Sequence, residues 1–215
     1  MPRRISEVHE QAFVGIESAR AYAEEAKSPF MRMGYGVVVE GISGLGVTGK
    51  FLEIGPGPAV LTTMVAQAIA EAHITAFELS PAMITVAREQ VEREGLTDRI
   101  ALVEGDANDT ELLEQLGRFD LVYSTYSLHH WDDPETVIKN LLRAVAPGGI
   151  LLIHDLKRVW WLYWIPSQEG FITSIRAAYT PAEIRDLLTG MGVDGCEIRS
   201  GLFWQSIIVR TKVSS

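Results

Sequence analysis

A glycine turn after a short apolar segment is the first feature of this sequence that could do chemistry. The segment 51–54 predicts a strand, and it runs into Gly55, Pro56 and Gly57 just before an expected helix. Glycine has no Cβ, so the backbone can turn sharply there and a ligand can approach closely. In open α/β sheets, ligands bind beyond the carboxyl ends of the strands. The turn is therefore a candidate binding site, and a tight turn without a ligand is the alternative.

Three carboxylates accompany this turn in positions that suit a nucleoside with a cationic end. Glu78 stands 23 residues after Gly55 at the end of the next expected strand, where an acid can accept both ribose hydroxyls. Asp106 follows the third expected strand. Glu53 precedes the first glycine by two residues, a poor position beside a pyrophosphate but a good one beside a cation.

Two adjacent histidines and an aspartate could move a proton at the same edge of the sheet. His129 and His130 follow the fourth expected strand, and Asp155 ends the fifth. Imidazole titrates near neutral pH, so either histidine is a candidate general base that Asp155 could orient. The alternatives are a packed histidine and capping roles for the other two residues. Neighbouring ligands do not have the spacing of a tetrahedral metal site, so no metal is expected.

An aromatic segment follows the fifth strand, with Trp160, Trp161 and Trp164 within five positions. Large aromatic side chains with a polar atom suit an apolar or aromatic ligand. Exposed patches of this kind mark interfaces. The segment is therefore predicted to be a wall or lid of a pocket, with simple packing or a homodimer contact as alternatives. The other candidates for this pocket are Met31, Arg32, Tyr35, Tyr126 and His129.

Strands and helices that alternate must position these residues. Strands are expected at 51–54, 73–78, 100–104, 120–124 and 150–155, and helices at 59–72, 81–94, 109–117 and 134–146. This alternation predicts βαβ units and a parallel sheet with both faces covered. A final helix at 181–191 precedes two strands, 197–199 and 203–210, whose short connection permits only antiparallel pairing. We therefore predict an α/β fold: a Rossmann-like three-layer sandwich with a seven-stranded, mostly parallel sheet and a C-terminal antiparallel hairpin.

Two further helices are predicted before the first strand. They cover residues 5–26, with Ser6 as a candidate N-cap, and 30–42, and Pro29 separates them. Residues 1–49 are thus predicted to form an N-terminal helical cap of the same domain, and residues 50–215 the ligand-binding domain.

Composition narrows the class of protein. The 215 residues carry 19 basic and 28 acidic side chains, and the net charge of −9 disfavours a nucleic-acid surface. Cys196 is the single cysteine, so an internal disulfide or a cysteine-rich metal site is impossible, and a reducing cytoplasm fits. No apolar run approaches the ~20 residues of a membrane span. We expect a cytoplasmic protein without a membrane span and without a nucleic-acid partner.

Five motifs in order resemble the class I S-adenosylmethionine-dependent methyltransferases. They are Phe51–Gly57, Phe77–Ser80, Glu104–Ala107, Phe119–Ser124 and Leu142–Gly149. The tract Ser127–Trp131 resembles the subgroup that includes ubiquinone and menaquinone methyltransferases and many small-molecule methyltransferases. The resemblance covers residues 50–155 and implies S-adenosyl-L-methionine as cofactor and S-adenosyl-L-homocysteine as product.

The resemblance also implies which residues hold the methionine part of the cofactor. Gly55, Pro56 and Gly57 would pack against it, Glu53 would face its cationic region, and Ser124 would lie beside it at the end of the fourth strand.

The nucleoside part is assigned in the same way. Glu78 would hold the ribose diol and Leu79 would pack on adenine. Asp106 would accept the adenine amino group, with the N–H of Ala107 near the ring, and Met83 completes the predicted set.

Taken together, these features predict methyl transfer to a small, apolar or aromatic acceptor. Carbon or oxygen methylation is favoured, with nitrogen as the other atom. Displacement on a sulfonium depends above all on positioning, so a catalytic base is needed only if the acceptor must lose a proton early.

Two other functions remain open at this stage. Pro58 and Ala59 stand where many members of the family have a small residue and a glycine, and a proline removes one backbone donor. This departure motivates a non-catalytic module that binds the cofactor or assembles with a partner. A nicotinamide-dependent oxidoreductase is the other alternative, and the missing third glycine and Glu53 weigh against it.

Overall fold

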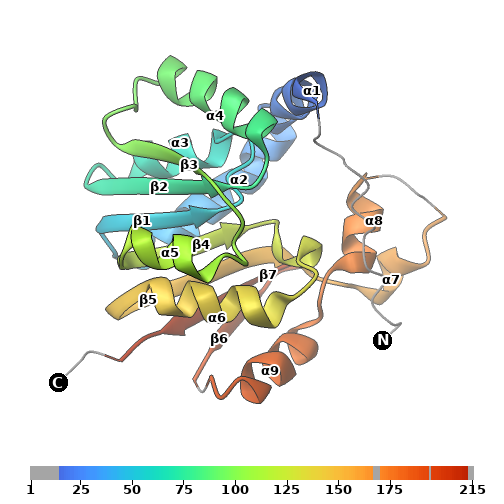
Figure 1. Cartoon of the computed structure of the whole chain (residues 1–215). Helices are drawn as coiled ribbons and strands as arrows, with labels where there is room; N and C mark the ends of the chain where they lie inside the picture. The colour runs from blue at the N-terminus through green and yellow to red at the C-terminus, as the bar shows by residue number, and fades with distance from the viewer. Residues whose placement is uncertain (1–14, 167–169, 194, 213–215) are drawn as a thin grey trace.

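A seven-stranded sheet runs through the centre of the molecule (Figure 1). The computed structural model describes residues 15–166, 170–193 and 195–212. The strands are β1 (Gly49–Ile54), β2 (Ala72–Glu78), β3 (Ile100–Glu104), β4 (Phe119–Thr125), β5 (Val145–Leu156), β6 (Glu197–Ser200) and β7 (Trp204–Arg210). Their order is β3-β2-β1-β4-β5-β7-β6. Strands β1 to β5 pair in parallel, whereas β7 pairs antiparallel with both β5 and β6.

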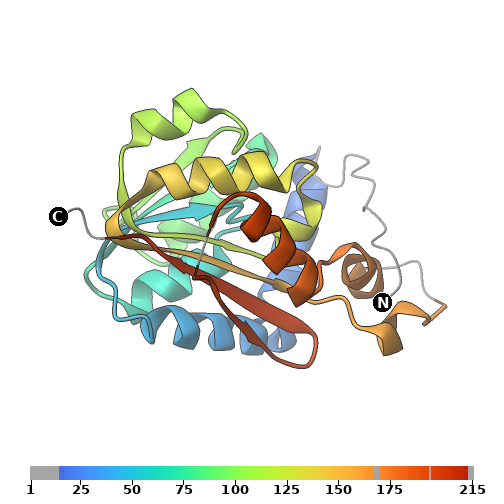
Figure 2. The same cartoon turned by 90° about the horizontal axis from the view of Figure 1, so that it is seen from below.

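Helices cover both faces of this sheet, as Figure 2 shows, with α6 on one side and α2 on the other. The helices are α1 (Ile16–Ala26), α2 (Pro29–Ser43), α3 (Val60–Ala68), α4 (Pro81–Arg93), α5 (Thr110–Leu116), α6 (Pro134–Ala144), α7 (Trp160–Tyr163), α8 (Gly170–Ala177) and α9 (Pro181–Gly190), with a 3-10 turn η1 (Leu128–His130). Helices α2, α3 and α4 bury their apolar residues in one core, and α5, α6 and α9 in the other. The predicted three-layer α/β fold is confirmed.

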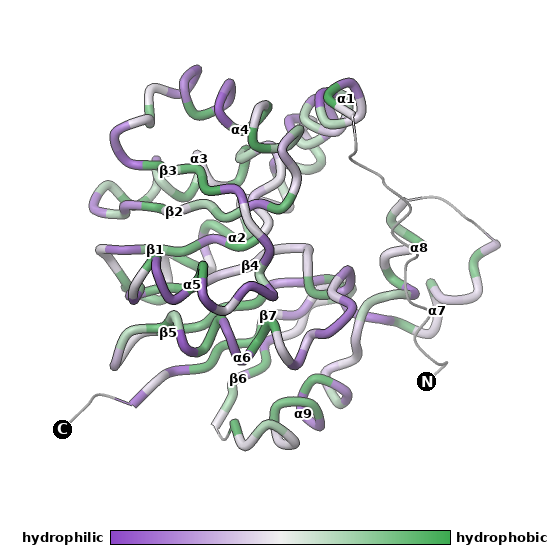
Figure 3. The backbone as a smooth tube through the Cα atoms, in the orientation of Figure 1, coloured by the Kyte–Doolittle hydropathy of each residue, from purple (hydrophilic) through white to green (hydrophobic). Residues whose placement is uncertain are grey.

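Alternation along the central strands divides their side chains between the two cores. Phe51 and Leu52 are adjacent on β1, yet Phe51 lies in the core beneath α2 and Leu52 in the core beneath α6. Tyr123 and Val122 divide in the same way on β4. A strand buried on both faces is apolar throughout, which is why these segments could be recognised. The outer helices are amphipathic, and hydrophilic and hydrophobic turns alternate along α4 in Figure 3.

The elements differ from the prediction at one strand in particular. The predicted helix ended at residue 146 and the predicted strand began at residue 150, but residues 145–149 belong to β5, which begins at Val145. The N–H of Gly148 donates to the carbonyl of Lys212, and the N–H of Thr211 donates to the carbonyl of Gly149. Pairing with the chain after β7 therefore joins the Pro-Gly-Gly segment to β5, although Gly148 has a positive φ of 79°.

The start of the chain is helical in its described part. Helix α1 begins at Ile16, and Ser6 and the rest of the predicted segment 5–14 lie outside the described residues. Helix α2 begins behind Ser28, whose hydroxyl accepts the N–H of Met31. Among the described residues, no helix is long and apolar enough to cross a membrane.

Candidate functional site

The candidate residues meet at one edge of the sheet, where β1, β2, β4 and β5 end. Because these strands are parallel, Ile54, Glu78, Thr125 and Leu156 all mark the same edge. The chain passes from β1 to β2 on one side and later returns to β4 on the other side of β1. This reversal of strand order beside β1 is the position at which open α/β sheets bind ligands.

The glycine turn is packed tightly against the end of β4. Gly55 has a φ of 71°, and a Cβ placed on it would lie 2.7 Å from Oγ of Ser127. Gly57 also has a positive φ, of 55°. Ala59 adopts a φ of 57° although it is not glycine. A left-handed conformation is strained for alanine, so the departure from the glycine pattern at residue 59 places strain at the start of α3.

Glu78 is fixed at this turn by backbone donors. Its Oε2 accepts the N–H of Gly57 and its Oε1 accepts the N–H of Ser80, both at 3.0 Å. Burial raises the pKa of Glu78, and these N–H groups oppose the rise. Each carboxylate oxygen can accept more than one hydrogen bond, so Glu78 keeps the capacity to accept the two hydroxyls of a ribose.

Glu53 is a buried carboxylate whose hydrogen bonding is incomplete. The hydroxyl of Tyr123 donates to its Oε2 at 2.9 Å, whereas no described residue donates a hydrogen bond to Oε1. Burial raises the pKa of Glu53 to about 7, the nearby Thr62 and Tyr123 hydroxyls oppose the rise, and the charge of Glu78 adds to it. An uncompensated buried carboxylate is costly. A cationic ligand end would supply the missing partner, so the site fits the cofactor that the resemblance implies.

The loop after β3 carries residues that were predicted to hold adenine. Asp106 is exposed, and its Oδ1 accepts both the backbone N–H and the side-chain amide of Asn108, each at 2.8 Å. Leu79 follows β2 and is 66% exposed, so its side chain is accessible to a flat ring. Asn140 of α6 donates to the carbonyl of Ala107 at 3.1 Å. Asn140 was not singled out from the sequence, because nothing local shows that α6 reaches this loop.

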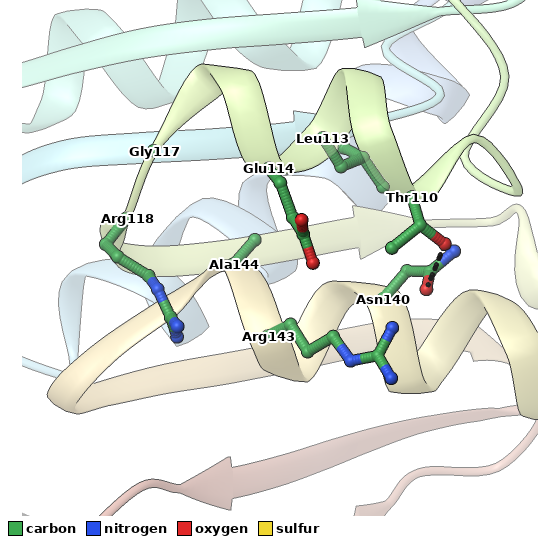
Figure 4. A pocket seen from close by; sticks show the side chains of 8 residues that line it. All are labelled: Thr110, Leu113, Glu114, Gly117, Arg118, Asn140, Arg143 and Ala144. Carbon is green, nitrogen blue, oxygen red and sulfur yellow. Dashed lines mark hydrogen bonds between the residues drawn. The ribbon is translucent and has the colours of Figure 1, made fainter.

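A groove of about 400 Å³ lies between α5 and α6 and has Asn140 in its lining (Figure 4). Within it, the hydroxyl of Thr110 donates to Oδ1 of Asn140 at 3.0 Å. The charged residues of the groove are Glu114, Arg118 and Arg143. None of the lining residues is a site candidate predicted from the sequence.

Two predicted cofactor residues are engaged in internal contacts. Ser124 is buried, and its hydroxyl donates to the carbonyl of Ile54 at 2.9 Å, which joins the ends of β4 and β1. Met83 is buried in a small cluster with Ala19 and Ala23 of α1 and Val86 of α4. Ser124 thus holds the sheet edge together, and Met83 anchors α1.

The structure brings His129 and Asp155 together. Nδ1 of His129 lies 2.6 Å from Oδ1 of Asp155, and Oδ2 accepts the backbone N–H of His129 at 2.8 Å. The ring of His130 lies beside that of His129, with centroids 3.9 Å apart. A third histidine, His154, is buried beside Ser206, and burial lowers its pKa to about 4. His154 is therefore neutral near pH 7, and the paired His129 is the better-positioned base.

Tyr126 occupies a strained position next to this pair. Its φ is 54°, and its ring packs against His154 and Tyr35, with centroid distances of 5.3 and 6.3 Å. Burial raises its pKa to about 12, with the charge of Asp155 as a second cause. Strained residues cluster at functional sites, so Tyr126 and Tyr35 are the best-placed of the predicted acceptor-pocket residues. Arg32, the charged residue among the predicted acceptor-pocket residues, is exposed.

The predicted tryptophan wall faces outward in this structure. Trp160, Trp161 and Trp164 are exposed, and α7 and α8 stand together beside the sheet edge at the right of Figure 1. Leu162 of α7 and Tyr126 pack against the same buried cluster of Leu156, Val159, Ile175 and Ala178. Leu162, rather than a tryptophan, is thus the α7 side chain directed toward the site.

Tyr22 of α1 is a further residue that the sequence did not reveal. Its Cε1 lies 3.8 Å from the position that a Cβ on Gly57 would occupy. Among the described residues, no group of three or more His, Cys, Asp or Glu side chains is arranged to hold a metal ion.

The comparisons with known proteins agree with this geometry. Residues 52–153 match a family model described as a methyltransferase domain. The chain is 34% identical over 101 residues to a malonyl-acyl-carrier-protein O-methyltransferase of Priestia megaterium, across 47% of this chain and 34% of that protein. It is 26% identical over 164 residues to a ubiquinone/menaquinone biosynthesis C-methyltransferase of Shewanella sediminis, across 67% of this chain and 64% of that protein. The chain thus spans less than two thirds of the length of either relative.

The solved structures show the same fold. An O-methyltransferase family protein from Burkholderia thailandensis superposes with a TM-score of 0.76 at 18% identity, across 96% of this chain and 62% of that chain.

Proposed function

We propose, from the premise that this chain carries a class I S-adenosylmethionine-dependent methyltransferase domain over residues 52–153, that it transfers a methyl group to a small-molecule acceptor. The observation that carries the proposal is the pair of buried carboxylates at the glycine turn. Glu78 accepts the N–H of Gly57. Glu53 is buried next to the turn, and no described residue donates a hydrogen bond to its Oε1. A ligand with a diol and a cationic end matches both.

The cofactor supplies an electrophilic methyl group on a sulfonium. Around it, Glu78 accepts the ribose hydroxyls and Glu53 faces the amino group. Gly55 and Gly57 leave room for close approach because neither carries a Cβ. Leu79, Asp106 and the backbone of Ala107 are proposed to hold adenine, while Pro56, Met83 and Ser124 support the site from behind.

The acceptor is proposed to enter between α2, the end of β4 and the α7–α8 segment. Tyr35 and Tyr126 form an aromatic wall there, and Leu162 packs against the same cluster as Tyr126. Such a wall suits an apolar or aromatic acceptor. Relatives named as C- and O-methyltransferases support carbon or oxygen as the methylated atom, with nitrogen as the remaining possibility.

His129 is proposed to take the proton that such an acceptor loses. Asp155 holds Nδ1, so Nε2 of a neutral ring is the basic nitrogen. The ring of His130 lies beside that ring at a tilt of 43° and is proposed to position it. Where the acceptor is already nucleophilic, positioning supplies the acceleration and the base is dispensable.

The N-terminal segment 1–49 is proposed to act as a cap of the 50–215 domain. The described part of this cap supports the idea, because α1 contacts α4 and α2 contributes Tyr35. A cytoplasmic location, a homodimer and the absence of a nucleic-acid partner stay predictions.

The non-catalytic module is retained as a second candidate because of one observation. Ala59 holds a left-handed conformation where glycine would be unstrained, which could weaken the cofactor site. The nicotinamide alternative receives no comparable support, since Glu53 lies buried at the turn.

The deciding experiment has two stages on the purified chain. Calorimetry with S-adenosylhomocysteine is expected to show micromolar binding. Transfer of a labelled methyl group from S-adenosylmethionine to quinols, phenols and amines is then measured. Absence of binding by the folded protein would overturn the proposal, and binding without transfer to any acceptor would favour the module.

A further inference from the structure

Helix α1 contributes one side chain to the glycine turn. Tyr22 lies halfway along α1, and its Cε1 is 3.8 Å from the point where a Cβ on Gly57 would stand. Gly57 is the residue whose N–H donates to Glu78. The tyrosine is therefore placed over the part of the turn that faces the ribose and methionine side of the site.

The surroundings of Tyr22 keep its hydroxyl protonated. Burial raises its pKa, and the carboxylates of Glu25 and Glu78 add to the rise. Burial likewise raises the pKa values of Tyr35 and Tyr126, and Tyr22 is a smaller cause of both shifts. All three hydroxyls thus keep their protons near neutral pH and remain hydrogen-bond donors. They come from α1, α2 and the residue after β4, and the rings of Tyr35 and Tyr126 pack together.

Small side chains attach α1 to the rest of the molecule, and Ala26 at its end lies in the main core. Ala19 and Ala23 pack against Met83 and Val86 of α4. Arg20 forms an ion pair with Glu89 at 2.6 Å, and both side chains are exposed. Alanine methyl groups bury little area and exposed ion pairs are weak. A helix held in this way can open at low cost, which a ligand beneath Tyr22 requires for entry.

We propose that Tyr22 is a cofactor-binding residue: its hydroxyl donates a hydrogen bond to the ribose–methionine side of the bound cofactor, so that α1 closes over the site. The inference rests on the proposed cofactor. It adds a contact from the N-terminal cap, which none of the motifs between residues 50 and 155 contains. It also gives the cap a function in binding rather than only in covering the sheet.

The test is the affinity of the full chain for S-adenosylhomocysteine in the Tyr22→Phe variant. Loss of one hydrogen bond to the cofactor is expected to weaken binding roughly three- to tenfold in a variant shown to be folded. Tyr163→Phe on α7 is the matched control, and its affinity is expected to equal that of the parent.

Hydrogen exchange gives a second, independent reading on the unmodified protein. Saturating S-adenosylhomocysteine is expected to slow amide exchange in residues 16–26. Equal affinities of the parent and Tyr22→Phe, or unchanged exchange in α1, would overturn this inference and leave the proposed function standing. Failure of the parent itself to bind would overturn both.

Discussion

Nδ1 of His129 lies 2.6 Å from Oδ1 of Asp155, and the second oxygen of that carboxylate accepts the backbone N–H of His129. The two residues are 26 positions apart, and both are buried. Asp155 also accepts the N–H of Leu156 at 2.7 Å. The carboxylate therefore fixes both the backbone and the ring of His129 at the sheet edge.

Asp155→Asn should separate catalysis from cofactor binding. Loss of the carboxylate removes the orientation of the ring, so turnover is expected to fall about 100-fold for an acceptor that must lose a proton, with S-adenosylhomocysteine affinity within about twofold of the parent. The free energy of unfolding should drop by ~1–3 kcal/mol, because a buried donor loses a strong acceptor. His129→Ala should match this loss of turnover, and a larger loss in His130→Ala would assign the base to His130 instead.

Glu78→Ala should weaken cofactor binding by ~1–3 kcal/mol, since the ribose hydroxyls and the N–H of Gly57 lose their acceptor. Calorimetry with S-adenosylhomocysteine measures this directly. Glu104→Ala, at the end of the neighbouring strand β3, is the control and should bind like the parent. Unchanged affinity in a folded Glu78→Ala protein would refute the ribose assignment.

Glu53 should make the stability of the ligand-free protein fall as the pH rises. Its pKa is raised from 4.5 to about 7, so in that interval the folded protein keeps a proton that the unfolded chain has lost. Protonated Glu53 therefore contributes up to ~3 kcal/mol to the free energy of unfolding. This contribution is complete below the unfolded pKa and is lost as the pH rises through about 7. Chemical denaturation of Glu53→Gln between about pH 5 and about pH 8 should show a flatter profile than the parent. An identical profile would contradict the assignment.

The same carboxyl group should release a proton when a cationic ligand binds. The ligand favours the ionised form of Glu53, because opposite charges at close range lower the pKa of an acid. Calorimetric enthalpies of S-adenosylhomocysteine binding near pH 7, in two buffers of different ionisation enthalpy, should therefore differ. Glu53→Gln should remove most of this difference.

Gly55→Ala should destabilise the protein by at least ~2 kcal/mol, from the left-handed backbone and the contact of its Cβ with Ser127. Gly57→Ala is the matched control, because its φ is also positive while its nearest neighbour, Tyr22 Cε1, is 3.8 Å away. Gly57→Ala should therefore lower the free energy of unfolding by less than Gly55→Ala does. The double variant Gly55→Ala with Ser127→Ala should recover part of the loss, and no recovery would show that backbone strain dominates.

Asn140→Asp should loosen the loop that is proposed to hold adenine. The amide of Asn140 donates to the carbonyls of Ala107 and Asn108, and a carboxylate of the same shape cannot donate. We expect unfolding free energy to fall by ~1–3 kcal/mol and S-adenosylhomocysteine affinity to fall about tenfold. Thr110→Val removes only the hydrogen bond to Oδ1 of Asn140 and should retain affinity. Discrimination between S-adenosylhomocysteine and S-inosylhomocysteine should shrink in Asn140→Asp, which a purely structural role would not cause.

Local patterns in the sequence determined the order of elements and one half of the site. The apolar segments bounded by glycine and proline predict buried strands whatever their neighbours are. The glycine turn at Gly55 and the carboxylates at strand ends could be located because strand ends in a parallel sheet share one edge. Glu53 and Glu78 were found in this way.

Tertiary structure alone decided the rest, because the deciding contacts join residues far apart in the chain. Tyr22 reaches Gly57 only through the angle at which α1 packs on α4. Asn140 reaches the Ala107 loop only because α6 lies beside it. The Pro-Gly-Gly segment belongs to β5 because the chain after β7 pairs with it. Short-range propensity cannot report such contacts, since their free energy comes from long-range packing and hydrogen bonding rather than from neighbouring residues.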